Sequence, residues 1–305
     1  MKTLKFTAAA AALLFTLGAC GSDAGTSSTT DATDTVATSG DVRATDVSHI
    51  EKVDDIAALL PESVTKDGKL TIGTNAFYAP AEFYAEDGTT MQGFDVDLAN
   101  ALGKVLGLEV TMENAEFAAV IPGIGKTYEA GIAAISVNPE RQEAVDLTQY
   151  YEAGLQWAVP SGNPKKFDPA DVCGKVVGVQ TGTAQDEYLT ELNTTNCKDK
   201  PVQIQRQSEQ PRISLELAQG QLDAMFADTP VIDFAILQTN KQIEKIGKPI
   251  DVVGLAIATP KGDPTTEAID KALQHLIDTG ELAKIFETWG IKDGVATSVA
   301  LNPAK

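Results

Sequence analysis

The chain has 305 residues, of which 24 are Lys or Arg and 43 are Asp or Glu, so its formal net charge at pH 7 is −19. This excess of negative charge argues against nucleic acid or an anionic lipid surface as a partner, because both repel an acidic protein. Neither the composition nor the charge identifies a small-molecule ligand.

Residues 1–19 are typical of a bacterial lipoprotein signal peptide. Lys2 and Lys5 precede an apolar run over 6–17 that is too short to anchor a protein across a bilayer. The run leads into the letters LGAC, which match the bacterial lipobox and end at Cys20. This resemblance implies cleavage before Cys20 and attachment of a diacylglycerol to its sulfur, and two acyl chains hold a protein stably on a membrane. The alternative is a soluble secreted protein with a chance cysteine.

Residues 20–55 are rich in Ser, Thr, Asp, Ala and Gly and contain few large apolar side chains. Such a segment buries too little surface to offset its ordering entropy, which predicts a disordered tether behind the lipidated Cys20. The remainder is longer than one hydrophobic core usually supports, so we expect it to form two lobes.

Strands and helices alternate along the rest of the chain. Leu98, Leu102 and Val105 lie on one face of a predicted helix over 94–106. Strands are expected at 69–74, 108–112, 130–135, 176–180, 202–205, 224–226 and 252–258, and further helices after Gly182-Thr183 and at 213–222, 229–237, 266–277 and 281–289. The alternation predicts two parallel α/β units, with extended hinge segments near 155–160 and 251–258. Ligands of such sheets bind at the carboxyl ends of the strands.

Short motifs across both units resemble those of one protein family. The motifs are GTNAFYAP (73–80), GFDVDL (93–98), IP (121–122), ISVNPER (135–141), QTGT (180–183), DAMFAD (223–228), GEL (280–282) and WG (289–290). Their order and spacing resemble the amino-acid-type extracellular solute-binding proteins, family 3, of ABC importers. The resemblance implies an α/β fold of the type II periplasmic-binding-protein kind. Lobe 1 is then expected at 56–157, lobe 2 at 158–250, and the return to lobe 1 with the C-terminal helices at 251–305.

The same resemblance implies a clamp for a zwitterion. Arg141 matches the arginine that holds the ligand α-carboxylate, for which a planar guanidinium offers two parallel hydrogen bonds. Asp228 matches the acceptor of the ligand α-ammonium. Without the resemblance, Arg141 reads as a solvated surface charge and Asp228 as a turn residue. Because the two residues belong to different lobes, a ligand that bears both charges would favour the closed form.

Further ligand contacts follow from the resemblance. Tyr78 and Phe117 match aromatic positions that flank the ligand side chain, although Phe117 also reads as core. Thr183 begins a helix, where it is a second carboxylate contact, an ordinary N-cap, or both. The other implied contacts are the Ser136 hydroxyl, the Ala134 main chain, Asn75 and Gln180. Asn75 stands where binders of basic amino acids commonly carry Asp, so the amides of Asn75 and Gln180 suit a neutral polar side chain such as that of glutamine.

These expectations describe a monomeric, membrane-anchored receptor outside the cytoplasm, in the periplasm or on the outer face of the membrane. It binds a small polar solute, an amino acid in particular, and delivers it to ABC permease subunits. We expect no metal, cofactor or nucleic acid. In an exported chain Cys173 and Cys197 most simply form a disulfide, reduced thiols being the alternative.

We expect no enzymatic activity, because the sequence has no metal-ligand cluster and its two histidines, His49 and His275, lie in the tether and on a C-terminal helix. Two alternatives remain open. Periplasmic cyclohexadienyl dehydratases use the same fold, and a carboxylic acid with a lysine suffices for such chemistry. A receptor that reports to a separate membrane kinase is the other alternative.

Overall fold

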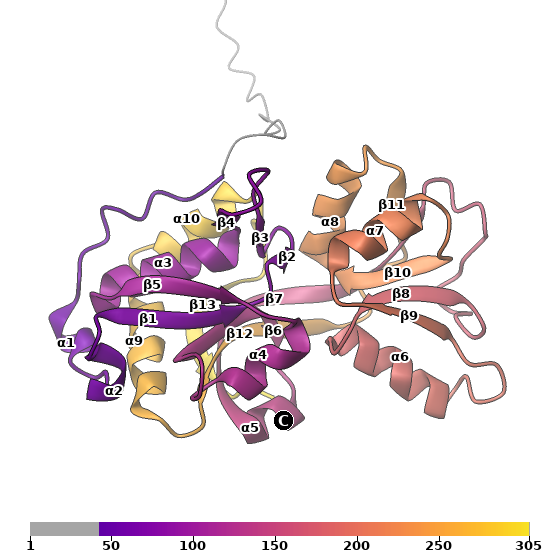
Figure 1. Ribbon diagram of the computed structural model, residues 1–305. Helices are drawn as coiled ribbons and strands as arrows, with labels where there is room; N and C mark the ends of the chain where they lie inside the picture. Colours follow the sequence, from indigo (N-terminus) through magenta and orange to yellow (C-terminus); the bar gives the residue numbers. More distant parts are fainter. Residues whose placement is uncertain (1–42, 305) are drawn as a thin grey trace, which may run out of the picture. The chain divides into compact units, whose positions relative to one another are not determined.

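The computed structural model describes residues 43–304, which form two α/β lobes (Figure 1). The expected signal peptide, Cys20 and the tether up to residue 42 lie outside these residues. Over 43–304, no helix is long and apolar enough to cross a bilayer.

Lobe 1 is built on the parallel strands β5 (Glu109–Asn114), β1 (Lys69–Thr74) and β6 (Ala130–Ser136), with β12 (Val252–Pro260) antiparallel beside β6. Every residue of β6 is buried, as expected for a strand covered on both faces. Ile132 and Ala134 face a core shared with α3 (Phe94–Leu106), α9 (Pro264–Asp278) and α10 (Glu281–Thr288). Ala133 and Ile135 face the opposite side, where α4 (Phe117–Gly123) packs.

Smaller elements complete lobe 1. A three-stranded sheet of β2 (Phe77–Tyr78), β3 (Glu82–Tyr84) and β4 (Met91–Gln92) lies between β1 and α3 in the chain. Two short helices, α1 (Asp54–Ala57) and α2 (Glu62–Thr65), precede β1, and α5 (Pro139–Ala144) follows β6. The sheet β2–β4 and helix α5 carry residues that the sequence assigns to the ligand site.

Lobe 2 repeats the α/β pattern with the parallel strands β9 (Gln203–Gln207), β8 (Val176–Gln180) and β10 (Ala224–Asp228). Its helices are α6 (Ala184–Thr194), α7 (Gln210–Ala218) and α8 (Thr229–Gln238). The core contains Trp157 stacked on Phe226, with ring centroids 4.1 Å apart. Cys173 and Cys197 form a disulfide between the segment before β8 and the segment after α6.

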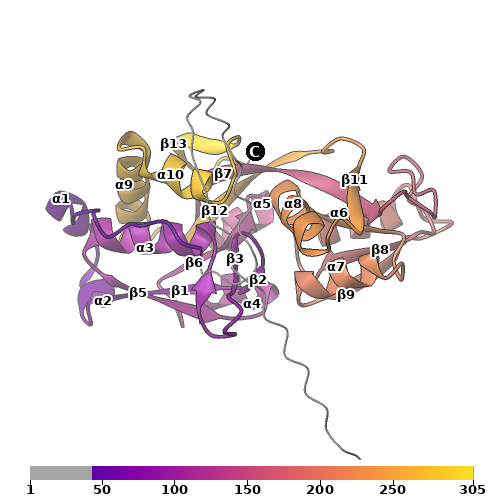
Figure 2. The ribbon, with the colours of Figure 1, turned by 90° about the horizontal axis from the view of Figure 1, so that it is seen from above.

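One long strand belongs to both lobes. β7 (Val145–Pro160) pairs with β12 up to Gly154, and from Leu155 onward it pairs with β10 and with β11 (Ile243–Ile246) (Figure 2). The returning chain crosses at the same level, where Ile250 N–H donates to Leu155 O (2.9 Å) and Leu155 N–H donates to Asp251 O (3.0 Å). The crossover therefore lies at the start of the two extended segments that the sequence suggests as hinges.

Residues 43–55 correct the expected extent of the tether, because this stretch packs on lobe 1. The Arg43 N–H donates to the side chain of Gln92, and its guanidinium lies 5.6 Å from the centre of the Trp289 ring. Thr45 donates to Asp97 Oδ2 through both its N–H and its hydroxyl, each at 2.8 Å, and Trp289 Nε1–H donates to the same oxygen. Val47, Ile50 and Val53 also pack against the lobe 1 core. Composition alone missed this segment because these apolar residues are few and widely spaced among polar ones.

Residues 293–304 form what we term the C-terminal strap, which the sequence reading did not predict as a strand. Its strand β13 (Val295–Leu301) pairs antiparallel with β7. Beyond it, Asn302 Oδ1 accepts from Leu147 N–H (2.9 Å) and Asn302 Nδ2 donates to Asp146 Oδ1 (2.8 Å). Ala304 and Gln142 then exchange two hydrogen bonds. The strap thus fastens β7 to α5, the helix that contains Arg141.

We expect Asn302→Ala to destabilise the protein, because two partly buried hydrogen bonds to β7 are lost. Asn240→Ala is a matched control: Asn240 also has a left-handed φ, 51° against 48° for Asn302, and its side chain makes no hydrogen bond within residues 43–304. The free energy of unfolding in urea should fall by about 1–3 kcal/mol more in Asn302→Ala than in Asn240→Ala. Equal losses in the two variants would contradict a fastening role for the strap.

Candidate ligand-binding site

Arg141 is buried where the two lobes meet. Asn138 caps α5 by accepting the Arg141 N–H (2.7 Å), which sets the direction of the side chain. Nη1 donates to Ser136 O of lobe 1 (2.8 Å), and Nη2 donates to Gly182 O of lobe 2 (2.9 Å) and lies 3.4 Å from Glu187 Oε1. Only 8% of Arg141 is exposed, so it is not a solvated surface charge. Burial lowers the pKa of Arg141, but a guanidinium remains protonated in proteins.

Asp228 ends β10 on the other lobe and is 2% exposed. Its Oδ2 accepts from the Tyr78 hydroxyl of lobe 1 (2.8 Å), and its Oδ1 accepts from Gln185 Nε2 at the start of α6 (2.9 Å). Burial raises the pKa of Asp228 to about 6, against the opposing effects of these two donors and of the charge of Arg141. Asp228 is therefore a buried carboxylate with hydrogen-bond donors from both lobes.

The two amides expected near the ligand side chain contact each other. Gln180 Nε2 donates to Asn75 Oδ1 across the lobes (2.8 Å) and to Ser208 O (2.9 Å), while Asn75 Nδ2 donates to Ala115 O (2.7 Å). Both amide side chains are buried. This pair and the Tyr78–Asp228 bond mark a closed arrangement of the lobes, and a solute that enters between these groups must first part them.

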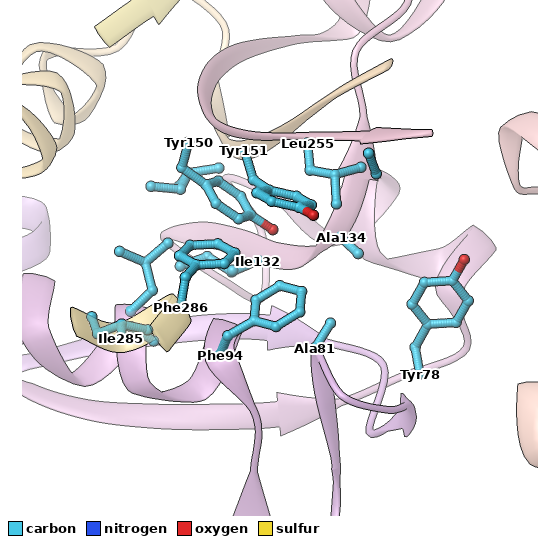
Figure 3. Close-up of a cluster of buried hydrophobic side chains, with 14 of the residues drawn as sticks. Tyr78, Ala81, Phe94, Ile132, Ala134, Tyr150, Tyr151, Leu255, Ile285 and Phe286 are labelled. Carbon is cyan, nitrogen blue, oxygen red and sulfur yellow. The ribbon is translucent and has the colours of Figure 1, made fainter. Parts of the chain in front are cut away.

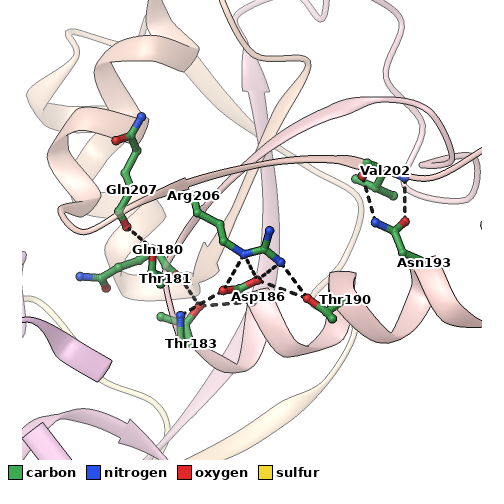
Figure 4. Close-up of polar contacts among 10 residues, drawn as sticks. Gln180, Thr181, Thr183, Asp186, Thr190, Asn193, Val202, Arg206 and Gln207 are labelled. Atoms are coloured by element: carbon green, nitrogen blue, oxygen red, sulfur yellow. Dashed lines mark hydrogen bonds and ion pairs between the residues drawn. The ribbon is translucent and has the colours of Figure 1, made fainter. Parts of the chain in front are cut away.

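Thr183 has the geometry of a helix cap. Its hydroxyl donates to Gln180 O (2.8 Å) and accepts from Asp186 N–H (3.3 Å) (Figure 4). Asp186 also accepts from Gly182 N–H, and Arg206 Nε–H donates to both oxygens of the Asp186 carboxylate at 2.8 and 3.1 Å. Thr183 is therefore the N-cap of α6, as one of the two interpretations of the sequence predicts. The contact of Thr183 with a ligand remains a prediction.

The remaining expected residues lie around Arg141. Ala134 adopts a left-handed backbone with φ of 46°, and its N–H donates to Asp95 Oδ2 (2.7 Å). Ser136 is buried and supplies the carbonyl that Arg141 binds. Phe117 is half-buried, with the Arg141 guanidinium 5.4 Å from its ring centre, which places it against the cation as well as against the lobe 1 core.

A pocket of about 230 Å³ opens on one side of Arg141. Phe117, Ile135, Glu140, Gly182 and Glu187 are among its lining residues, whereas Asp228 and Tyr78 are not. The pocket borders the expected site only at the Arg141 guanidinium. Tyr78 and Asp228, and likewise Asn75 and Gln180, form direct hydrogen bonds with each other and leave no space between them.

The sequence reading missed three polar groups at this site. Gln185 and Glu187 lie in the first turn of an amphipathic helix, where polar side chains usually face solvent. Glu82 is fully buried beside Asp95 in lobe 1. A carboxyl between two aromatic-rich segments carries no signal of burial in a single sequence, because Glu is seldom buried.

The fold and the buried charges on facing lobes define a hinged, two-lobed binding protein. The chain belongs to the bacterial extracellular solute-binding proteins, family 3, whose model matches residues 70–292. It is 30% identical over 256 residues to the arginine-binding protein ArgT of Corynebacterium glutamicum, a match that covers 83% of this chain and 84% of the relative.

Two solved structures are similar over the whole of their own chains. An ancestral arginine-binding protein bound to glutamine is 30% identical, with a TM-score of 0.66 and coverage of 73% of this chain and 97% of that one. An ancestral amino acid-binding protein, described as a precursor of cyclohexadienyl dehydratase, is 26% identical, with a TM-score of 0.67 and coverage of 76% and 99%. The family and the type II periplasmic-binding-protein fold are thereby confirmed.

Removal of the Tyr78 hydroxyl should raise the pKa of Asp228 above its value of about 6, because a donor that stabilises the ionised carboxylate is lost. A hydrogen bond to a charged group contributes about 1.5–3 kcal/mol, so the rise in Tyr78→Phe should be large enough to follow by carboxyl ¹³C NMR titration. Tyr84→Phe, on the same small sheet, is the control and should leave the titration unchanged. An unshifted Asp228 signal in Tyr78→Phe would show that the hydroxyl does not act on this carboxylate.

Proposed function

We propose that this protein is the extracytoplasmic receptor that captures an α-amino acid and delivers it to ABC permease subunits. One observation carries the proposal: the guanidinium of Arg141 in lobe 1 and the carboxylate of Asp228 in lobe 2 are both buried, and each makes a hydrogen bond to the facing lobe. A zwitterionic ligand matches this arrangement, because its carboxylate pairs with Arg141 and its ammonium with Asp228.

In this proposal the ligand replaces contacts that the lobes now make with each other. Its α-carboxylate takes the place of Gly182 O at Arg141, and the start of α6 supplies further N–H donors. Its α-ammonium approaches Asp228, while Tyr78 and Phe117 flank its side chain. Binding then favours closure, since only the closed form brings both lobes to one ligand.

The ligand side chain is proposed to end in a planar, nitrogen-bearing group. The amides of Asn75 and Gln180 can donate to and accept from a carboxamide, which favours glutamine. The similar ArgT is named for arginine, and the similar ancestral protein named for arginine has been solved with glutamine bound. Glutamine and arginine are therefore the two candidates. The choice between them depends on whether the uncharged Asn75 excludes the guanidinium of arginine.

A binding role also fits the likeness to the ancestor of a dehydratase, because that ancestor is itself described as an amino acid-binding protein. We therefore propose no enzymatic activity for this chain.

A thermal-shift panel of the standard amino acids, followed by calorimetry, tests the clamp. The amino acid that stabilises the native protein most should lose at least about 3 kcal/mol of binding free energy in Arg141→Ala, because its buried carboxylate is left without a partner. Arg212→Ala is the matched control, since this arginine lies on the exposed side of α7 and, among residues 43–304, pairs only with Glu216.

Unchanged affinity in Arg141→Ala would remove this residue from the site. A panel in which lysine binds best would overturn the proposed planar side-chain end, while it would leave the zwitterion clamp intact.

We further propose that Cys20 is the lipidated first residue of the mature chain. Mass spectrometry of the N-terminal peptide from membranes should show a diacylglyceryl group on Cys20. Cys20→Ala should shift the protein from the membrane to the soluble fraction, because it removes both acyl chains. Ser22→Ala is the control and should stay on the membrane. Membrane retention of Cys20→Ala would contradict this anchor.

A further inference from the structure

Glu82 and Asp95 form a pair of buried carboxyl groups within lobe 1. Glu82 begins β3 and Asp95 lies in the first turn of α3, and both are 0% exposed. Asp95 accepts two hydrogen bonds, from the Tyr150 hydroxyl to Oδ1 and from the Ala134 N–H to Oδ2, each at 2.7 Å. Within residues 43–304 neither oxygen of Glu82 has a hydrogen-bond partner, and Asp95 is the carboxyl group that neighbours it.

These contacts decide which of the two groups holds a proton. Two neighbouring carboxyl groups do not both ionise in a buried site, because neither water nor a cation compensates their charges. The two donors at Asp95 favour its ionised form, whereas Glu82 has only Asp95 as a neighbour with which to share a proton. The proton therefore belongs on Glu82, which donates it to Asp95.

The surrounding charges act in the same direction. Burial raises the pKa of Glu82 well above its ordinary value, and the negative charges of Asp95 and Asp228 raise it further. The remaining titratable neighbours are the hydroxyls of Tyr78 and Tyr150, whose pKa values are raised by burial and further by neighbouring carboxyl groups, Glu82 among them. Arg141 acts on Asp228 and is not among the groups that shift the pKa of Glu82 or Asp95.

The apolar surroundings keep the pair dry. Phe286 stacks between Phe94 and Tyr151, with ring centroids 4.9 and 4.8 Å away, and Tyr150 lies against the same cluster (Figure 3). Ala81, the residue before Glu82, is buried at the edge of this cluster. Since solvent does not enter such packing, the proton of Glu82 has no competing acceptor in water.

Asp95 also connects the pair to the ligand site. It binds the N–H of Ala134, whose φ of 46° is disfavoured for a residue with a Cβ. Two residues further on, the carbonyl of Ser136 binds the Arg141 guanidinium. The hydrogen bond between the Ala134 N–H and Asp95 thus stabilises the left-handed backbone near the end of β6. The segment that leads to Arg141 begins at this point.

We propose that Glu82 is a positioning residue of the ligand site: its protonated carboxyl donates to Asp95, and Asp95 fixes the left-handed Ala134 that precedes the Arg141 clamp. This inference rests on the proposed function, because it takes the Ala134–Ser136 segment to line the cleft. Glu82 itself does not touch the ligand.

The proposal predicts a specific pH profile. Burial raises the pKa of Asp95 to about 6, so Asp95 is ionised at neutral pH. The pKa of Glu82 is raised well above its ordinary value, so its protonated form and the bond to ionised Asp95 are present at neutral pH and are lost as the pH rises through the pKa of Glu82. Ionised Glu82 then repels Asp95 and releases Ala134. Ligand affinity should therefore fall on the alkaline side.

Calorimetry with L-glutamine and L-arginine, from about pH 7 to about pH 10, tests this profile. The affinity at each pH is calculated for the ligand form whose α-ammonium is protonated, because the ligand itself loses this proton on the alkaline side. In Glu82→Gln an amide donor replaces the proton at every pH, so affinity should stay within about threefold of native at neutral pH, and the alkaline loss should vanish. In Glu82→Met, which has similar volume but no donor, affinity should fall at least about tenfold at every pH. Glu129→Gln is the control for the substitution itself, because Glu129 is a lobe 1 carboxylate that accepts from Thr71 N–H outside the cleft.

Native affinity in Glu82→Met, or an unaltered alkaline loss in Glu82→Gln, would overturn the proposal. Carboxyl ¹³C NMR of the ligand-free native protein gives a second measurement that needs neither ligand nor a folded Met variant. The signal that disappears in Glu82→Gln should have the shift of a protonated carboxyl at neutral pH, and an ionised Glu82 would refute the inference. If neither amino acid binds the native protein, the proposed ligand class fails, while the NMR result still decides where the proton lies.

Discussion

The buried charges on the two facing lobes are the constraint on which the rest of this structure depends. A guanidinium or carboxylate taken out of water costs several kcal/mol unless hydrogen bonds and opposite charge compensate it. Arg141 obtains this compensation from Gly182 of the other lobe, and Asp228 obtains it from Tyr78. Closure therefore satisfies both charges at once. Opening must return them to water, which gives a zwitterion the means to shift the equilibrium.

The backbone makes this closure possible with little rearrangement inside either lobe. β7 is one continuous strand, yet its first part belongs to the sheet of lobe 1 and its last part to that of lobe 2. A small change in dihedral angles near Gly154 can move the lobes without breaking either ladder. There is no space for a side chain at that point, since a Cβ on Gly154 would lie 2.7 Å from Pro249. The C-terminal strap pairs with the lobe 1 part of β7, so it stiffens one side of the crossover.

Sequence patterns predicted those parts of the fold that depend on local periodicity or on family motifs. α3 begins and ends where its apolar spacing and Gly107 indicate, and β8 has the predicted bounds. The sequence predicted only the part of β7 near 155–160 and did not predict β13, because the pairing of both strands depends on residues far away in the chain. Arg141 and Asp228 were assigned through motif resemblance, and the structure places both at the meeting of the lobes. The Asn75–Gln180 contact could not be foreseen, since it joins residues that no local pattern links.

The charge balance of the site bears on the nature of its ligand. With the proton on Glu82, the buried groups near the clamp are one cation, Arg141, and two anions, Asp95 and Asp228, which leaves one negative charge uncompensated. A neutral zwitterion leaves that excess unchanged, whereas a ligand with an additional cationic group offsets it. Under the proposed function, the field of Asp95 thus favours arginine, and the uncharged amide of Asn75 favours glutamine. In that proposal, discrimination between the two ligands is therefore a competition between an electrostatic attraction and a short-range hydrogen-bond match.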